Sequence, residues 1–224
     1  MKLFSTSDIH GSCAIINKLS KIASECDLVL ICGDIGGKYR ANTVMELSEI
    51  QKRDAESLAD ALADLPVPSR FILGNDDWFE YAGENYLDGF FQIDGLEFIP
   101  FEYVLITPFN TNREVNENKM EYELGKLTAA HGHSFTDSVM VAHMPPYLCG
   151  DRIYNGERVG SHAVYNWIEE YQPKLWLCGH IHEDNSAHSI AGTKVFNCAS
   201  DHVKGILKGW LIDLDTLEYE SVEL

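Results

Sequence analysis

The chain has 224 residues, 45% of them hydrophobic and 23% charged, which is enough apolar material for one α/β domain spanning residues 1–224. Its 35 Asp and Glu residues outnumber its 17 Lys and Arg residues, and the formal net charge of -18 disfavours duplex nucleic acid while allowing a small phosphate ester wherever bound cations supply local positive charge. The first twelve residues lack the apolar core of a signal peptide, and no run approaches the ~18 apolar residues of a membrane span, so we expect a cytoplasmic protein that does not enter a membrane.

Strand-like and helix-like segments alternate along the chain. Eight apolar runs have the length of strands, at residues 2–7, 27–32, 69–73, 101–107, 138–143, 174–178, 193–198 and 209–214. Apolar residues recur at helical spacing between them, at residues 15–23, 44–65, 120–127 and 164–168. We expect Asn42 and Ser161 to cap the second and fourth helices and Pro173 to end the fourth. The alternation predicts an α/β fold.

The remaining segments carry weaker signals. Residues 77–100 and 108–118 lack a clear periodicity, so we expect loops there, and the chain after Gly179 is predicted to be mostly β-structure. The six cysteines form no C-x-x-C pair, and Cys32 and Cys178 lie inside apolar runs, where a thiol acts as a small hydrophobic group. We therefore expect six free thiols in a reducing compartment.

Polar side chains follow five of the predicted strands at the point where each strand ends. Three of these strand ends have a glycine, namely Gly33, Gly74 and Gly179, directly before the polar residue, which allows backbone to approach a ligand closely. Open α/β sheets bind ligands at the carboxyl ends of their strands. The seven side chains that can donate to a metal are Asp8, His10, Asp34, Asn75, His143, His180 and His182.

Each motif alone has a simpler interpretation. Asp8 and His10 are typical of a helix N-terminal turn, and the segments around Asp34 and Asn75 are typical of ordinary turns. A histidine at position 143 can be a hydrogen-bonded residue at a strand end. Together and in this order the motifs favour a metal centre. Seven donors are too many for one four-coordinate ion and suit two ions that share a carboxylate, for which Asp34 is the natural candidate.

The ordered set D-x-H, G-D, G-N, H and G-H-x-H, which spans residues 8–182, resembles the calcineurin-like metallophosphoesterase superfamily. The resemblance implies a four-layer α/β/β/α sandwich with two mixed sheets and a dinuclear metal site at the carboxyl ends of the strands. It also implies one ion held by Asp8, His10, Asp34 and His182, and a second held by Asp34, Asn75, His143 and His180. The segments 151–161 and 173–183 look most like the branch of brain metallophosphoesterase-domain proteins and small prokaryotic phosphodiesterases.

The function implied by this resemblance is hydrolysis of small phosphodiesters, or of phosphomonoesters, by a hydroxide that bridges two divalent ions. The mixed oxygen and nitrogen donors suit Mn, Fe, Zn, Ni or Co. Nucleotide pyrophosphohydrolase and protein phosphatase activities remain open. A further alternative is a catalytically weak or inactive scaffold of the same fold that makes protein contacts. A nuclease is disfavoured because no basic stripe is available to follow a strand.

The chain departs from the family pattern at one position. The family commonly has a histidine after the asparagine that matches Asn75, where it is assigned as a general acid or phosphate contact, but this chain has Asp76. An ionised carboxylate repels the substrate and has no proton to donate unless its pKa is raised. We therefore take Asn75 and Asp76 as the candidate catalytic residues. Asp77 is expected to orient an imidazole such as that of His10.

Several other residues are weaker candidates. Arg152 and Arg158 are suited to clamp a phosphate, although a surface position is the favoured interpretation. The helix start at Gly160 and Ser161 is suited to bind an anion, although an ordinary cap is favoured. Asn197 aligns with an asparagine-rich turn of the family without being assigned to the site. The histidines without ligand-like neighbours, predicted to be surface residues, are His131, His133, His162, His188 and His202.

Overall fold

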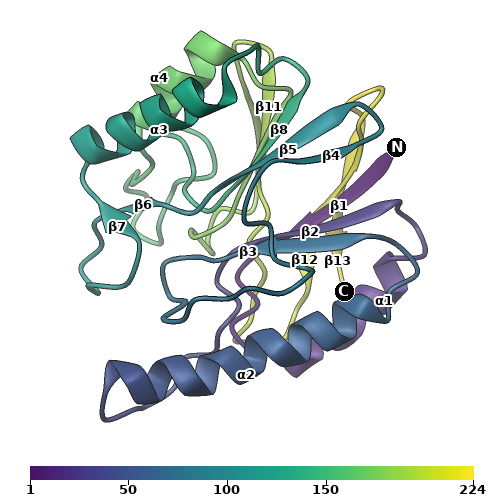
Figure 1. Cartoon of the computed structure of the whole chain (residues 1–224), viewed down its shortest axis with the longest axis vertical. Coiled ribbons are helices and arrows are strands. Elements are labelled where there is room, and N and C mark those ends of the chain that lie inside the picture. The colour runs from purple at the N-terminus through teal and green to yellow at the C-terminus, as the bar shows by residue number, and fades with distance from the viewer.

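The computed structural model describes residues 1–224 as two β-sheets packed face to face, with two helices on the outer face of each sheet (Figure 1). The helices of the N-terminal part, α1 and α2, cover one sheet, and α3 and α4 cover the other. The predicted four-layer α/β/β/α arrangement is confirmed.

The first sheet has five strands in the order β13-β12-β1-β2-β3. Their bounds are Lys2–Thr6 (β1), Leu28–Cys32 (β2), Ser69–Ile72 (β3), Lys208–Asp213 (β12) and Tyr219–Glu223 (β13). Strands β1, β2 and β3 are parallel, whereas β12 is antiparallel to β1 and β13 is antiparallel to β12. The carboxyl ends of the three parallel strands therefore lie along one edge of a mixed sheet.

The second sheet has six strands in the order β10-β11-β9-β8-β5-β4. Their bounds are Phe91–Ile93 (β4), Leu96–Phe101 (β5), Ser138–Ala142 (β8), Leu175–Cys178 (β9), Ala187–Ile190 (β10) and Thr193–Asn197 (β11). The four central strands are parallel and the two outer strands are antiparallel to their neighbours. Two short strands, β6 (Val104–Leu105) and β7 (Glu114–Val115), pair separately.

The four helices are α1 (Cys13–Ile22), α2 (Val44–Ala63), α3 (Glu117–His131) and α4 (His162–Tyr171). Ser161 caps α4 as predicted, because its side chain accepts a hydrogen bond from the backbone N–H of Val164 at 3.2 Å. The cap of α2 is Thr43 rather than Asn42. Thr43 accepts a hydrogen bond from the backbone N–H of Glu46, and the Glu46 carboxylate accepts one from the backbone N–H of Asn42, the residue before the cap.

The apolar runs of the sequence are continuous because the central strands are buried on both faces. In β2, Val29 and Ile31 pack toward α1 and α2, while Leu28 and Leu30 face the opposite sheet. The same alternation holds in β8, where Val139 and Val141 face the first sheet and Met140 packs toward α3 and α4. Three apolar layers of 16 to 18 buried residues each therefore hold the sandwich together.

One strand lies earlier in the chain than predicted. The predicted strand 101–107 and loop 77–100 are replaced by β4, by β5 at residues 96–101 and by the two-residue β6. Pro100 hides β5 from a pattern-based prediction because it cannot donate a hydrogen bond to a neighbouring strand. The structure tolerates it because β4 pairs with β5 only as far as Phe98, which leaves that side of Pro100 without a partner strand.

All six cysteines are free thiols, as predicted, and five of them are buried. After Gly179 every regular element is a strand, which agrees with the predicted β character, although irregular segments hold more than half of these residues. None of the four helices has both the length and the apolar character that crossing a bilayer requires.

Candidate metal centre

The predicted ligands all lie where a strand reaches the same edge of the sandwich. Asp8 follows β1, Asp34 follows β2 and Asn75 follows β3, in three adjacent strands of the first sheet. His143 follows β8, while His180 and His182 follow β9, in two adjacent strands of the second sheet. A bridge between Ser7 and Ala199 joins the two sheets at this edge.

The backbone at this edge has an unusual conformation. Asp8, His10, Asp34 and His180 have positive φ angles of 59°, 46°, 55° and 70°, a region that non-glycine residues seldom adopt. Such strain persists only where the surrounding structure imposes it, and it is concentrated at functional sites. Four of the predicted ligands therefore have a backbone conformation that is unfavourable by itself and that the surrounding structure must stabilise.

The three glycines before the ligands allow very close approach. A Cβ atom at Gly179 would lie 2.0 Å from Ser7 Oγ and 2.4 Å from Asp8 Oδ2. A Cβ atom at Gly74 would lie 2.2 Å from Asp34 Oδ1, and one at Gly33 would lie 2.6 Å from His143 Nδ1. A side chain at any of these positions would therefore displace one of the predicted metal-binding residues.

The first donor group consists of Asp8, His10, Asp34 and His182, whose ligand atoms all lie within 4.8 Å of one another. His182 Nε2 lies 3.0 Å from Asp8 Oδ1, and His10 Nε2 lies 3.6 Å from Asp34 Oδ2. The other oxygen of Asp8 accepts the backbone N–H of His180 at 3.0 Å. Two carboxylates and two imidazoles are therefore close enough together to bind one metal ion.

The second donor group consists of Asp34, Asn75, His143 and His180. His143 Nε2 lies 3.4 Å from Asp34 Oδ1, and the centroids of the His143 and His180 rings are 5.3 Å apart. Asn75 Nδ2 donates to Thr111 Oγ1 at 2.7 Å, which fixes the amide so that its Oδ1 is available to a ligand. The two oxygens of Asp34 thus face different donor groups, as expected of a shared carboxylate.

The hydrogen bonding of these residues fits divalent cations. His10 Nδ1–H donates to the carbonyl oxygen of Gly36, and His143 Nδ1–H donates to that of Cys32 at 2.6 Å, so both rings direct Nε2 into the site. His10 Nε2, His143 Nε2 and Asn75 Oδ1 are buried without a hydrogen-bond partner. Such buried polar atoms are costly, and a bound cation would satisfy all three.

The charges in the site are strongly coupled. Burial raises the pKa of Asp34, but the neighbouring His143 opposes it, and the pKa lies well below its ordinary value. Burial lowers the pKa of His143, but Asp34 opposes it more strongly and raises that pKa to about 10. Burial lowers the pKa of His10 and of His180 to about 4, so both rings are neutral at pH 7, the form that binds metal.

An open cleft of about 870 Å³ lies in front of these residues. Asp34, Asn75, His180 and His182 form one part of its lining. The lining also has apolar and aromatic side chains, which are Trp78, Leu105, Ile106, Phe109, Met144 and Tyr154. Three of these side chains are strongly exposed, with exposed fractions of 65% for Ile106, 79% for Phe109 and 85% for Tyr154. The lining of the cleft therefore combines metal-donor side chains with exposed apolar ones.

Asp76 lies in the cleft beside a cation that the sequence did not single out. Its carboxylate is 3.6 Å from Lys38 Nζ, and both residues line the cleft. The backbone N–H of Asp76 donates to Asp34 Oδ1 at 2.8 Å. Burial and the charge of Asp34 raise the pKa of Asp76, while Lys38 opposes them. The position that holds a histidine in the family here carries an ion pair.

Asp77 does not orient His10, and that prediction is wrong. Its buried carboxylate accepts the backbone N–H groups of Ile35 at 2.9 Å, Gly36 at 2.7 Å and Gly74 at 2.7 Å. It therefore holds together the two loops that carry Asp34 and Asn75. The imidazole of His10 is oriented by the backbone carbonyl group of Gly36 instead.

The weaker sequence candidates lie elsewhere. Arg158 Nη1 is paired with the buried Asp151 at 2.6 Å, and neither Arg152 nor Arg158 lines the cleft. The helix start at Ser161 is already occupied by the carboxylate of Glu117, which accepts hydrogen bonds from Ser161 Oγ and two backbone N–H groups. Asn197 Nδ2 donates to the carbonyl oxygen of Ile181, so Asn197 supports the loop between His180 and His182.

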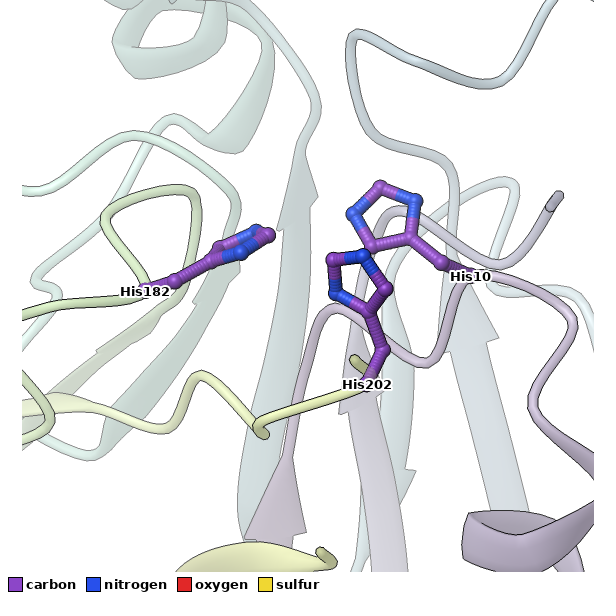
Figure 2. A group of neighbouring side chains, drawn as sticks. All are labelled: His10, His182 and His202. Carbon is purple, nitrogen blue, oxygen red and sulfur yellow. The ribbon is translucent and has the colours of Figure 1, made fainter. Parts of the chain in front are cut away.

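Two of the five histidines predicted at the surface are placed differently. His131 is buried, stacks on Phe135 and forms a short hydrogen bond with Glu97. His202 lies at the first donor group, with its ring centroid 4.2 Å from that of His10 (Figure 2). Sequence spacing could not reveal this position, because His202 is 20 residues from the nearest predicted ligand, His182.

Comparisons with known proteins identify the family and the fold. Among curated sequences, the UPF0046 protein T07D4.2 of Caenorhabditis elegans is 36% identical over 61 residues, a stretch that covers 27% of this chain and 15% of that protein. The crystal structure of TT1561 of Thermus thermophilus has a TM-score of 0.70 at 19% identity, covering 99% of this chain and 97% of that one.

A dimetal phosphatase from Danio rerio has a TM-score of 0.58 at 11% identity, covering 100% of this chain and 92% of that one. At these identities the structural likeness shows the fold. The sequence profile of the calcineurin-like phosphoesterases matches residues 1–184, which include all the predicted ligands. The chain therefore belongs to the calcineurin-like phosphoesterase family.

Proposed function

We propose that this phosphoesterase hydrolyses small phosphodiesters, and phosphomonoesters as secondary substrates, with two divalent cations held by the two donor groups. The observation that carries the proposal is the position of Asp34. One of its oxygens lies 3.6 Å from His10 Nε2 and the other lies 3.4 Å from His143 Nε2. A carboxylate between two sets of inward-facing donors is the arrangement required to bridge a pair of ions.

The protein residues would control charge and orientation in this reaction. When bound, two divalent ions would hold the phosphate oxygens and lower the pKa of a water molecule toward ~7. Asp8 and Asp34 would offset only half of the four positive charges, which leaves a net positive pocket in an acidic protein. The backbone carbonyl groups of Gly36 and Cys32 would keep His10 and His143 oriented.

The cleft supports diesters over monoesters. A diester carries one negative charge and two organic groups, whereas a monoester at pH 7 carries nearly two negative charges and one organic group. A net positive pocket attracts the doubly charged monoester more strongly, and Asp76, whose charge Lys38 offsets only in part, reduces that advantage. The apolar side chains of Ile106 and Phe109 in the cleft lining offer contact area to the organic groups.

The test is hydrolysis of bis-p-nitrophenyl phosphate with added Mn²⁺, which we propose as the first ion to try. We expect turnover that disappears with a chelator and in Asp34→Ala, and that persists in the control Asp88→Ala, since Asp88 is exposed and outside the cleft. A parallel series with p-nitrophenyl phosphate and a nucleotide pyrophosphate ranks the substrate classes. A purified protein that binds no metal by elemental analysis would refute the proposal and favour a protein-contact scaffold.

We further propose a cytoplasmic location. Its support is the set of six free thiols, which is typical of proteins in a reducing compartment.

A further inference from the structure

His202 lies in a tight turn between β11 and β12. Asp201 and Ile206 exchange backbone hydrogen bonds at 3.1 and 3.0 Å, and Lys204 pairs with Asp201 at 2.7 Å, so the turn is closed at its base. Figure 2 shows the His202 ring beside that of His10, with His182 entering from the opposite side. A histidine far from the ligand motifs in sequence is thus held at the first donor group.

The distances place His202 within reach of the same ion. Its ring centroid is 4.2 Å from that of His10 and 5.0 Å from that of His182. One ligand atom from each of the three rings lies within 4.8 Å of the other two. Two nitrogens bound to one ion at 2.0–2.1 Å lie at most about 4.2 Å apart, so the three rings need only a small adjustment. The group that contains Asp8 and Asp34 shares His10 and His182 with this one, so the His202 ring would also have to move toward the two carboxylates.

The hydrogen bonding of His202 is that expected of a metal ligand rather than of an ordinary surface histidine. Its Nδ1 is buried from solvent and has no hydrogen-bond partner. A surface histidine would direct both nitrogens to water, and a structural histidine would pair the buried nitrogen, as His131 does with Glu97. His10 Nε2, in the same donor group, is the other imidazole nitrogen left without a partner at this point.

We propose that His202 is a fifth protein ligand, through Nδ1, to the ion held by Asp8, His10, Asp34 and His182. This inference rests on the metal centre of the proposed function and adds a residue that lies outside the ligand motifs. The first ion then has three imidazoles and two carboxylates around it, whereas the second has two imidazoles, one amide oxygen and the shared carboxylate.

The unequal donor sets have a chemical consequence. Five protein ligands leave an octahedral ion at most one open position, whereas four leave two. With His202 as a ligand, the first ion would have fewer positions open to substrate than the second, so the substrate phosphate would bind mainly at the ion held by Asn75, His143 and His180. The additional imidazole also favours ions such as Zn²⁺, Ni²⁺ or Co²⁺ over Mn²⁺ at the first position.

The experiment compares metal binding in the wild type, in His202→Ala and in the control His162→Ala. His162 is an exposed histidine at the start of α4, so its loss removes an imidazole without touching the cleft. Each metal-free protein is titrated with Co²⁺ against a competing chelator. The visible absorption of Co²⁺ is recorded at each step, because its intensity depends on the number of ligands.

We expect His202→Ala to weaken one of the two bound ions by at least roughly 10- to 100-fold, to raise the absorption of that ion and to leave the other unchanged. His162→Ala should match the wild type in both measurements. Identical affinities and spectra for wild type and His202→Ala would overturn the inference while leaving the proposed function intact. A wild type that binds no Co²⁺ would refute both.

A folding control keeps the result interpretable. His202→Leu retains a bulky side chain and supplies no nitrogen or oxygen donor. Urea unfolding of the metal-free proteins should give closely similar midpoints for the wild type and this variant. Weakened binding of one ion in a variant that keeps the wild-type midpoint assigns the effect to the lost nitrogen, and unchanged binding in that variant contradicts the inference.

Discussion

His143 Nε2 lies 3.4 Å from Asp34 Oδ1, although the two residues are 109 positions apart in the chain and belong to different sheets. Burial lowers the pKa of His143, but Asp34 raises it to about 10, so the ring of the metal-free protein is cationic at pH 7. A cation that binds at this nitrogen must displace its proton. Metal affinity should therefore rise with pH between about 6.5 and 10, by about tenfold per unit for each proton displaced.

Calorimetry at pH 7.5 in two buffers of different ionisation enthalpy measures this proton release directly. We expect at least one proton per protein to be released on loading, and His143→Gln to release one fewer, whereas His162→Gln should match the wild type. Metal binding with a binding enthalpy that does not depend on the buffer would contradict the assignment of His143 as a ligand.

Asp77 should give the metal-free protein a stability that depends on pH. Burial and the charge of Asp34 raise its pKa to about 7, although backbone N–H groups oppose them. Because this folded-state pKa is higher than the ordinary value of 3.8, the contribution of Asp77 to stability is greatest below pH 4 and is lost as the pH rises to about 7. Asp77→Asn removes the titrating group and with it this slope.

Urea unfolding in the presence of a chelator, at several values between pH 4 and pH 8, checks this expectation. The free energy of unfolding of the wild type, minus that of Asp77→Asn, should fall as the pH is raised. The same difference taken with the control Asp88→Asn should not change with pH. Parallel pH profiles for wild type and Asp77→Asn would show that Asp77 titrates normally.

The convergence of the candidate metal donors at one edge could be predicted because their signals are local. An apolar run, a glycine and a polar residue follow one another within a few positions at β2, β3 and β9, and buried parallel strands bring these ends together. Asp34 illustrates this, since Gly33 before it allows the close approach of His143.

The surroundings of the donors depend on long-range pairing that leaves no local pattern. His202 reaches the site because β12 pairs with β1, where Ser5 faces Trp210 across more than 200 positions. Lys38 and Phe109 lie in irregular segments whose path is set by packing rather than by periodicity. β5 was missed because Pro100 interrupts the strand pattern that a search along the sequence requires.

Asp76→His should restore the general acid that the family usually has at this position. We expect kcat/KM for an ester with an alkyl leaving group to rise by about 100-fold, the lower end of what a positioned acid contributes, with a much smaller gain for p-nitrophenyl esters. Asp76→Asn separates the loss of the negative charge from the gain of a general acid, because it removes the charge without supplying a proton. An alkyl ester rate that stays unchanged or falls in Asp76→His would show that Asp76 has a role of its own, together with Lys38.

Gly74→Ala and Gly125→Ala should have opposite effects. A Cβ atom at Gly74 would lie 2.2 Å from Asp34 Oδ1 and 2.5 Å from the backbone nitrogen of Asp34, so the carboxylate between the donor groups must move. We expect a loss of roughly 1–3 kcal/mol in the free energy of unfolding of the metal-free protein and a lower metal content.

Gly125 is exposed inside α3 and a Cβ atom there meets nothing within 4 Å, so alanine should stabilise the protein by about 1 kcal/mol with unchanged metal content. Urea unfolding with a chelator and elemental analysis of the loaded proteins measure both quantities. A Gly74→Ala variant that keeps two ions per chain and the wild-type stability would mean that Asp34 is free to move. The tight contact at Gly74 would then not be what fixes the shared carboxylate between His10 and His143.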